Sequence, residues 1–419
     1  MAVAGRVEHL RLDGMRALCA VLGDPQHDQP TVHITGTNGK GSVARMVTAL
    51  LSAHDLPVGT YTSPHLEAIN ERISRSGEPI SDVTLAALLT DLASIEPLVA
   101  PPPSYFELLT AAAYRWFSDE AVAAAVVEVG LLGRWDATNV VDGLVAVLTN
   151  IGHDHTDGQG DWRRRIAEEK VGIVKPGATF VLGETDPALR GVFASTAAAE
   201  VWRRDEDFGC TANRLAVGGR VLDLRTPTTS YDDVFLDAHG AHQGDNAAIA
   251  VAAAEAFFGR PLDEELVVDA LARVRSPGRF EVVGRAPLVV LDGAHNPDGA
   301  NALAEALDEG FAIAGHRRLV LGVLAGRDPV ELLVRLGAED AIEVLCCTPD
   351  SPRALPGADL AAVVREHGGT ARVVPDVADA VRSALDESAA EDAVVVTGSL
   401  YTVGAARAAC RRLGLVSEP

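Results

Sequence analysis

The sequence predicts an α/β protein with two domains, a larger one built on a parallel-rich sheet and a smaller one that follows it. Two observations lead to this prediction. Short apolar runs with the length of buried strands alternate with Ala-rich stretches at helical spacing. The chain has 419 residues, 47% of them hydrophobic, which is more than one ordinary core accommodates. We place the domains at residues 1–284 and 285–419.

The first domain begins with a strand, a glycine-rich turn and a helix. Thr31–Thr35 has the pattern of a buried strand, and the apolar residues of Val43–Leu51 recur at helical spacing. Further strands are expected at Ala125–Val129, Leu144–Thr149 and Ala178–Gly183. This order, with helical stretches between the strands, predicts a mostly parallel sheet.

The middle of the chain leads into the second domain. Val201–Asp233 is polar and is expected to be irregular, Gln243–Phe258 is expected to form one long helix, and Arg275–Arg279 is expected to form a hinge. A second series of strands is then expected at Leu288–Leu291, Leu319–Val323, Ile342–Leu345, Arg372–Val374 and Ala393–Val396. Helical runs separate these strands, so the second domain is also expected to be α/β.

Charge and composition exclude several classes of protein. The formal net charge of −23 argues against a nucleic-acid surface. No apolar run approaches the ~20 residues that cross a bilayer, so we expect no membrane partner. Met1–Leu12 lacks the apolar core of a signal peptide, and the five cysteines show no metal-ligand spacing. We therefore expect a cytoplasmic protein, and as a separate expectation we take it to be a monomer.

The run that carries most chemical information is Gly36-Thr37-Asn38-Gly39-Lys40-Gly41-Ser42. Glycines allow backbone N–H groups to converge on phosphate oxygens, and the following helix presents its positive end. Lys40 can reach the terminal phosphates, and Ser42 lies close to where a magnesium ion would sit. The spacing differs from the common Walker pattern, because Gly41 separates the lysine from the hydroxyl. The alternative is a glycine turn that binds no nucleotide.

Carboxylates and histidines follow two other expected strands. Glu128 ends one strand, at the sheet edge where a carboxylate can hold a metal over bound phosphates. Asn150–Asp157, which contains His155, directly follows the next strand and is a candidate second metal or substrate site. A polar turn without function is the alternative for this second run.

Lysine is rare in this chain. Lys40, Lys170 and Lys175 are the only lysines among 36 basic residues, and the other basic residues are arginines. Arginine does not replace lysine where a compact ammonium or a deprotonatable amine is required. The three lysines are therefore candidates for specific chemistry, with chance survival as the alternative, above all for Lys175.

Together these motifs resemble one family, the folylpolyglutamate synthase and dihydrofolate synthase branch of the Mur-type ligases. In the first half of the chain, the resemblance rests on the following segments: Gly36–Ser42, Tyr61–Leu66, Asn70–Arg72, Ser104–Glu107, Glu128–Gly130, Asp136–Asn139, Asp154–Asp157 and Glu169-Lys170. In the second half it rests on His242-Gln243 with Asn246, Pro277–Glu281, Leu291–Pro297 and Thr397–Tyr401. These matches occur in order over nearly the whole chain.

The resemblance implies both the fold and the reaction. The expected fold is a P-loop ATPase domain of the Mur-ligase type with a Rossmann-like C-terminal domain. The expected reaction is ATP-dependent addition of L-glutamate to a folate or pteroate through an acyl phosphate. Three alternatives remain: a Mur-type ligase for another carboxylate acceptor, a catalytically silent nucleotide-binding regulator, and a simple phosphate-loop ATPase or kinase. The last does not explain the motif at Asp292–Pro297.

The resemblance also implies roles for single residues. ATP would be held by Thr37, Asn38, Gly39, Lys40, Gly41 and Ser42, with Asn246, Arg279, Asp292 and His295 closing around the nucleotide. Mg²⁺ would be bound by Ser63, Glu128 and His155. The catalytic groups would be Lys40, His155 and Lys170, the last as a carbamate. Substrate would be bound by His65, Phe106 and Asp136.

Three positions depart from the family pattern. Leu132 replaces a glycine and is followed by Gly133-Arg134-Trp135. Leu10–Gly14 reads Leu-Arg-Leu-Asp-Gly where a Leu-Gly-Leu motif is expected, and Arg327 stands where a lysine is usual. The first two lie where the resemblance places the pterin site, so the identity of the acceptor is less firmly predicted than the reaction.

Overall fold

A computed structural model describes residues 11–153 and 160–416 and divides the chain into two compact units. The first unit comprises residues up to 65, 69–237 and 243–275. The second comprises 66–68, 238–242 and 276–419. The second unit thus begins at Ser276, inside the expected hinge, and includes the last residues of the range that we assigned to the first domain.

An eight-stranded sheet forms the centre of the first unit, with strand order β4-β3-β2-β5-β1-β6-β7-β8. The strands are β1 (Thr31–Thr35), β2 (Val58–Tyr61), β3 (Ile73–Arg75), β4 (Glu78–Pro79), β5 (Ala124–Glu128), β6 (Gly143–Leu148), β7 (Thr179–Leu182) and β8 (Glu200–Arg203). All neighbours pair in parallel except those that involve β3 and β4. The parallel-rich sheet expected from the sequence is confirmed. Every residue of β1 and β5 is buried, including the polar Thr31, His33 and Thr35 of β1, as expected for central strands of a parallel sheet that is covered on both faces.

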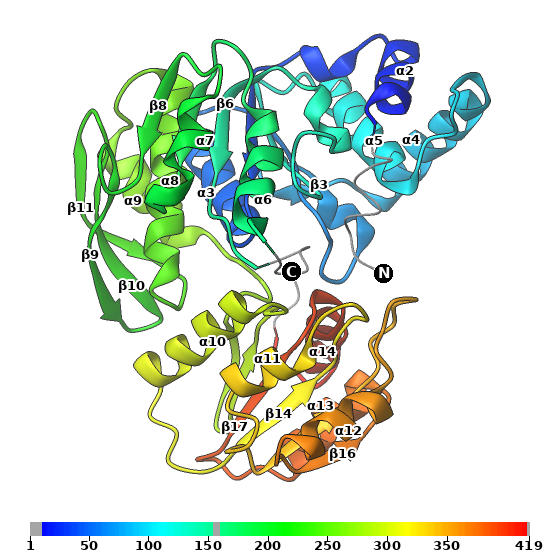
Figure 1. The fold of residues 1–419 in the computed structure, drawn as a ribbon, viewed down its shortest axis with the longest axis vertical. Helices are drawn as coiled ribbons and strands as arrows, with labels where there is room; N and C mark the ends of the chain where they lie inside the picture. The colour runs from blue at the N-terminus through cyan, green and yellow to red at the C-terminus, as the bar shows by residue number, and fades with distance from the viewer. Residues whose placement is uncertain (1–10, 154–159, 417–419) are drawn as a thin grey trace. The chain divides into compact units, whose positions relative to one another are not determined.

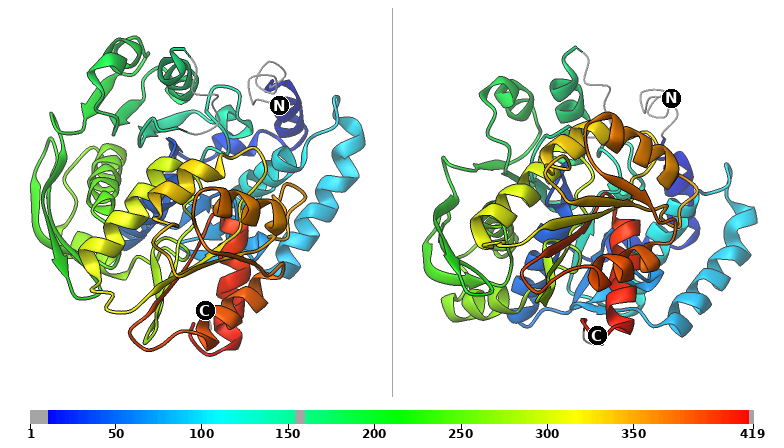
Figure 2. Two further views of the ribbon diagram at one scale, coloured as in Figure 1. Left: turned by 60° about the horizontal axis from the view of Figure 1, so that its bottom comes forward. Right: turned by 90° about the horizontal axis from the view of Figure 1, so that it is seen from below.

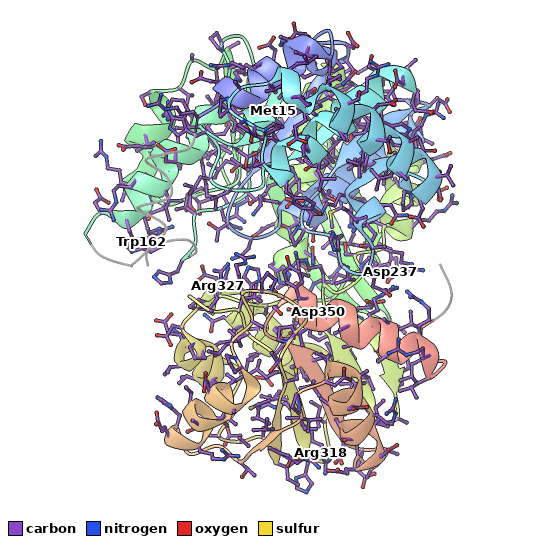
Figure 3. All side chains as sticks on the ribbon, turned by 90° about the vertical axis from the view of Figure 1, so that its right-hand side faces the viewer. Met15, Trp162, Asp237, Arg318, Arg327 and Asp350 are labelled. Carbon is purple, nitrogen blue, oxygen red and sulfur yellow. The ribbon has the colours of Figure 1, made fainter. Side chains whose placement is uncertain are left out.

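Helices cover this sheet. They are α2 (Asp13–Val21), α3 (Lys40–Ala53), α4 (Asp82–Ile95), α5 (Tyr105–Asp119), α6 (Trp162–Lys170), α7 (Arg190–Ala194), α8 (His242–Phe258) and α9 (Glu264–Arg273). Short 3₁₀ turns lie at Pro25–His27, Ile69–Arg72, Glu96–Leu98, Ala137–Val140, Val171–Ile173 and Pro187–Leu189. A reciprocal capping box between Ser104 and Glu107 starts α5. Helices α2, α4 and α5 share one apolar core with β2 and β5, into which Met15 of α2 is fully buried (Figures 1 and 3).

The prediction of an irregular stretch at Val201–Asp233 was wrong. Besides β8, this region forms a separate antiparallel sheet of β9 (Gly209–Ala216), β10 (Gly219–Arg225) and β11 (Ser230–Leu236), visible in Figure 1. One face of the sheet is solvated, so polar residues alternate with buried ones, as at Leu222 and Leu224 of β10. This alternation reads as polar when it is averaged over the segment.

The second unit is a six-stranded sheet with helices on both faces (Figure 2). Its strands, in the order β12-β13-β17-β14-β15-β16, are β12 (Glu281–Arg285), β13 (Leu288–Leu291), β17 (Ala393–Thr397), β14 (Arg317–Leu321), β15 (Glu343–Cys346) and β16 (Ala371–Val373). Only β12 runs antiparallel. Arg318 and Asp350 mark the two ends of the strands in Figure 3.

Two apolar cores fix these helices to the sheet. One core contains residues of α10 (Pro297–Gly310), α11 (Pro329–Arg335) and α12 (Gly357–Glu366), and the other contains residues of α13 (Val377–Asp386) and α14 (Leu400–Arg412). A parallel sheet buried on both faces is the doubly wound arrangement, so the expected Rossmann-like domain is confirmed. In the part of the chain that the structure describes, no helix combines the length and the apolar character needed to cross a bilayer.

A short segment of the N-terminal half packs within the second unit. The Glu67 carboxylate forms ion pairs with Arg407 and Arg411 of α14, and Arg407 also pairs with Glu281. Burial alone would raise the pKa of Glu67, but hydrogen bonds from both arginines outweigh it and hold the pKa below its usual value. Gly404 of α14 is required at this contact, because its Cβ would lie 1.8 Å from the Leu66 carbonyl oxygen.

Candidate nucleotide-binding and catalytic site

Four adjacent strands bring the predicted motifs together. Strands β2, β5, β1 and β6 are neighbours and run parallel, so their carboxyl ends lie at one edge of the sheet. Ser63, the loop Gly36–Ser42 and Asn150 follow β2, β1 and β6, and Glu128 is the last residue of β5. Sequence reasoning placed the phosphate loop, Glu128 and Asn150 at the ends of predicted strands but predicted no strand before Ser63. The strand order now places all four side by side.

The loop Gly36–Ser42 has a backbone that depends on its glycines. Gly36 has φ 150°, and a Cβ there would lie 1.8 Å from the Thr149 hydroxyl oxygen. Gly39 has φ 83° and caps α3, which begins at Lys40. A Cβ at Gly39 would lie 2.4 Å from Asn246 Oδ1, so the predicted residue Asn246 does lie against this loop. The geometry suits a phosphate, with a glycine cradle that leads into the positive end of a fourteen-residue helix.

The loop after β6 is hydrogen-bonded to the phosphate loop along its length. Asn38 N–H donates to Asn150 Oδ1 (2.9 Å), and Thr37 N–H donates to the Asn150 carbonyl (3.0 Å). Gly152 N–H donates to Thr37 Oγ1 (2.9 Å), and Thr149 Oγ1 donates to the Asn38 carbonyl (2.6 Å). Sequence reasoning missed Thr149 as a site residue. A polar residue at the end of an otherwise apolar strand was the available indication.

Glu128 lies beside the start of α3. The Ser63 backbone N–H donates to Glu128 Oε2 (3.0 Å), and a side chain at Gly41 would begin 3.7 Å from the same oxygen. The structure therefore brings together Ser63, Glu128 and the loop that carries Ser42. A hard cation prefers such carboxylate and hydroxyl oxygens.

The third expected metal ligand, His155, lies outside the described residues. Within residues 11–153 and 160–416, no three His, Cys, Asp or Glu side chains gather as a metal cluster. Among the described residues, the expected site thus offers the Glu128 carboxylate near Ser63 and Ser42, which fits Mg²⁺ bound mainly by phosphate oxygens and water.

Lys40 and Lys170 both donate to the carbonyl oxygen of Gly36. The Nζ–O distances are 3.0 Å for Lys40 and 2.6 Å for Lys170. Lys40 also donates to the Thr37 carbonyl (3.1 Å), and Lys170, the last residue of α6, is only 4% exposed. A solvated surface lysine is therefore excluded for Lys170. Lys175 donates to the Asn139 carbonyl (3.0 Å), on a 3₁₀ turn of the same unit, and burial lowers its pKa.

Asp136 organises the loop after β5. Its carboxylate accepts hydrogen bonds from Leu131 N–H (2.8 Å), Thr138 N–H (3.0 Å) and Thr138 Oγ1 (2.5 Å). Burial raises the pKa of Asp136, against the effect of these donors. Leu132, which follows Leu131 in this loop, has φ 59°, in the left-handed region that favours glycine. The Leu132 carbonyl accepts a hydrogen bond from Thr35 Oγ1 (2.5 Å).

The other two expected substrate residues are placed differently. Phe106 packs under Gly130, where a Cβ would lie 2.4 Å from its ring, so Phe106 and Asp136 meet at the same loop. His65 instead accepts a hydrogen bond from Arg72 Nε (3.0 Å). Burial and the Arg72 charge lower the pKa of His65. At neutral pH His65 is thus an uncharged imidazole.

The predicted residues of the second unit form their own group. Asp292, at the carboxyl end of β13, accepts from Phe280 N–H (2.7 Å) and Ala294 N–H (2.8 Å). Burial raises the pKa of Asp292, and the positive charge of Arg279 opposes this shift. His295 Nδ1 lies 2.7 Å from the Gly293 carbonyl. The structure therefore places Arg279, Asp292 and His295 around one turn.

Comparisons with known proteins agree with this geometry. Residues 278–400 match the family model described as Mur ligase, glutamate ligase domain. The dihydrofolate synthase/folylpolyglutamate synthase of Mycobacterium tuberculosis is 42% identical over 94% of this chain and 89% of its own. The crystal structure of the M. tuberculosis folylpolyglutamate synthase complexed with ADP and AMPPCP has a TM-score of 0.90 at 39% identity, covering 99% of this chain and 98% of that one.

A further solved structure contains a metal ion and an amino acid. It is a bifunctional folylpolyglutamate synthase/dihydrofolate synthase with Mn, AMPPNP and L-glutamate bound, with a TM-score of 0.84 at 31% identity and 98% coverage of both chains. The similarity extends over both units of the present chain. It supports a nucleotide and a divalent metal ion as the ligands of this fold.

The site also makes a prediction about pH. His33 of β1 is fully buried, and its Nε2 lies 2.9 Å from Thr138 Oγ1, whose own proton goes to Asp136. Its Nδ1 has no hydrogen-bond partner within the described residues. Burial, and then the charge of Lys175, lower the pKa of His33 to about 3. The folded protein therefore binds fewer protons than the unfolded chain below pH 6.5, and stability is lost as the pH falls towards 3.

We expect His33→Asn to remove this loss. On moving from pH 7 to pH 4.5, the free energy of unfolding should fall by about 2–3 kcal/mol more in the unmodified protein than in the variant. Urea unfolding at the two pH values measures the difference. The same change at the exposed His367 controls for the loss of an imidazole. Equal pH dependence in the protein and in His33→Asn would contradict the assignment of a neutral buried histidine.

Proposed function

The chain belongs to the dihydrofolate synthase/folylpolyglutamate synthase family of Mur-type ligases, and we propose that it couples L-glutamate to the carboxylate of a folate or pteroate with ATP. The observation that carries this proposal is the glycine-dependent loop Gly36–Ser42 beside Glu128 in a chain that is similar to these ligases over both units. Its expected small-molecule partners are ATP, L-glutamate and a pterin-containing acid.

The reaction requires activation because a carboxylate does not condense with an amine at neutral pH. Transfer of the γ-phosphoryl group of ATP to the carboxylate gives an acyl phosphate. The amine of glutamate attacks its carbonyl carbon, and phosphate leaves from the tetrahedral intermediate. Positioning and neutralisation of charge supply most of the acceleration in such phosphoryl transfers.

The phosphate loop would bind ATP through its backbone N–H groups and through Lys40. The lysine already points at the loop, because its Nζ donates to the carbonyls of Gly36 and Thr37. Mg²⁺, when bound, would neutralise charge on the phosphates. Ser63, Glu128 and His155 are the proposed residues that hold it. Asn246 would border the nucleotide through its contact with Gly39, and Arg279, Asp292 and His295 are proposed as nucleotide contacts from the second unit.

A monomer in the cytoplasm completes the proposal. The net charge of −23 opposes self-association. All five cysteines are free, which is typical of a reducing compartment. A silent nucleotide-binding regulator is disfavoured, because Lys40, Glu128 and Lys170 are all present at the sheet edge.

Phosphate release tests the activity directly. ATP, Mg²⁺ and L-glutamate are supplied with either tetrahydrofolate or dihydropteroate, and product mass confirms the added glutamate. We expect acceptor-dependent release that Lys40→Ala lowers by at least 1000-fold, because the lysine offsets charge on the transferring phosphoryl group. If neither acceptor supported phosphate release, the folate assignment would be overturned. A Lys40→Ala variant with unchanged activity would overturn the assignment of the nucleotide site.

We propose that Lys170 carries a carbamate in the active protein. Two ammonium groups that share one carbonyl oxygen repel each other, and burial at 4% exposure makes the charged form of Lys170 costly. An uncharged amine attacks CO₂, forms an N–C bond and releases a proton. The product is an anion, so repulsion with Lys40 becomes attraction and a metal ligand is gained.

Lys170→Arg separates the carbamate from a simple positive charge. A guanidinium does not form a carbamate, so we expect Lys170→Arg to lose at least 100-fold in kcat although the charge is kept. Lys170→Ala should also be inactive, and added acetate should restore part of its rate. A mass increase of one CO₂ on the peptide with Lys170, measured after trapping, is the direct readout. A fully active Lys170→Arg protein would remove the carbamate from the mechanism.

The loop with Leu132 bears on the acceptor. In its αL conformation this residue costs about 1–2 kcal/mol relative to a glycine, and it adds a side chain beside the Asp136 network. Arg11, an exposed residue just before α2, is the second departure. Both positions lie where the resemblance places the pterin.

We expect the specificity constant kcat/KM to be higher for tetrahydrofolate than for dihydropteroate. Replacement of Leu132 by glycine should reduce the difference in kcat/KM between the two acceptors, because it removes a side chain from the loop. Trp135→Phe, in the same loop, serves as a matched control. The measurement is kcat/KM for both acceptors in all three proteins. A clear preference for dihydropteroate in the unmodified chain would refute this prediction.

A further inference from the structure

Helix α6 is attached to the nucleotide-binding edge at both of its ends. At its carboxyl end, Lys170 donates to Gly36, and Glu169 accepts a hydrogen bond from Arg134 N–H (2.9 Å). Trp162, labelled in Figure 3, begins the helix, and Arg163 follows it. A helix of nine residues is rigid over its length. The contacts that fix its first turn therefore also fix the position of its last residue, Lys170.

An ion pair at the first turn holds the backbone of one residue, Ile151. The Ile151 N–H donates to Glu184 Oε2 (2.7 Å), and Arg163 donates to the Ile151 carbonyl (3.1 Å). Arg163 also pairs with Glu184 (3.4 Å) and with Asp186 (2.6 Å). Ile151 is 3% exposed, and the side chain of Glu184 is 9% exposed. The N–H and the carbonyl of this buried residue are therefore bound by a carboxylate and by a guanidinium, respectively.

The residues on either side of Ile151 are those that contact the phosphate loop. Asn150 exchanges hydrogen bonds with Asn38, and Gly152 donates to Thr37. A closed ring of contacts results. It runs from the phosphate loop through Asn150–Gly152 to Arg163 and Glu184, along α6 to Lys170, and back to the phosphate loop at Gly36.

The carboxylate of Glu184 is fixed before Arg163 meets it. Its Oε1 accepts from Thr185 N–H (3.1 Å) and Asp186 N–H (2.9 Å), directly after β7. The neighbouring pair Arg164–Glu168 is different. It joins two exposed positions one turn apart on α6 and is 2.9 Å long. An exposed pair of this kind contributes little, so Arg164 is a natural control on the same helix.

We propose that Arg163 and Glu184 are positioning residues for the reaction. They act through Ile151 and through α6, and they set the distance between Lys170 and the phosphate loop. This inference rests on the proposed function, since it assigns the ring of contacts to ATP and Mg²⁺ binding. An arginine suits position 163 better than a lysine, because one guanidinium contacts both the Ile151 carbonyl and the two carboxylates.

Arg163→Met is the main test, with Arg164→Met as its matched control. We expect Arg163→Met to weaken binding of a fluorescent ATP analogue with Mg²⁺ at least fivefold. Its kcat should fall at least tenfold, and the Mg²⁺ concentration for half-maximal rate should rise. Arg164→Met should remain within twofold in each measurement. Arg163→Lys and Glu184→Gln should lie between these limits, because each keeps one of the contacts to Ile151.

Thermal melting distinguishes positioning from loss of fold. A defect in Arg163→Met that vanishes well below its melting temperature, or equal nucleotide affinity in Arg163→Met and Arg164→Met, overturns the inference. Nucleotide binding is measured without an acceptor, so this outcome is independent of whether glutamate ligation itself is found. A protein that binds ATP normally but ligates nothing would contradict the proposed function, while the binding comparison would still decide the role of Arg163.

Discussion

Gly36 imposes the constraint on which the rest of the site depends. Thr149 leaves no space for a side chain there, so only glycine lets β1 and β6 approach at their carboxyl ends. That approach lets the segment after β6 hydrogen-bond to the phosphate loop, and it turns the Gly36 carbonyl towards two lysines. One backbone position thus determines the shape of the loop and the meeting point of Lys40 and Lys170.

Charge is organised locally against the overall charge of the protein. With a net charge of −23, the field of the whole chain repels ATP, folates and glutamate, all of which are anions. The N-terminus of α3 and the lysines at Gly36 provide positive potential where the phosphates would bind. A carbamate on Lys170 would make one of these groups negative, which is useful only beside a cation. The proposed modification and the proposed Mg²⁺ therefore depend on each other.

The parts predicted from the sequence are those with strong local patterns. The buried strands β5 and β13 read as apolar runs, and the glycines of Gly36–Ser42 predicted the loop after β1. The rarity of lysine singled out Lys170, which is buried. The antiparallel sheet β9–β11 was missed because its solvated face hides a two-residue alternation. Arg163 and Glu184 were missed for another reason. Arginine–carboxylate pairs are common in sequences. This pair is notable only because it binds the backbone of Ile151, which is distant from both residues until the chain folds.

Leu132 shows how a departure from the family pattern can be tolerated. Its αL backbone is unfavourable for a leucine, but its carbonyl accepts the short hydrogen bond from Thr35 and its side chain packs against the apolar core under α6. Full burial of a leucine contributes roughly 1.5–3 kcal/mol, and the partial burial of Leu132 provides a fraction of this against the backbone strain. The same packing ties the loop after β5 to a core that contains Ile166 and Ala167 of α6, the helix that ends at Lys170. Strain at this position is thus linked to the site, which is the physical basis of the proposed preference between acceptors.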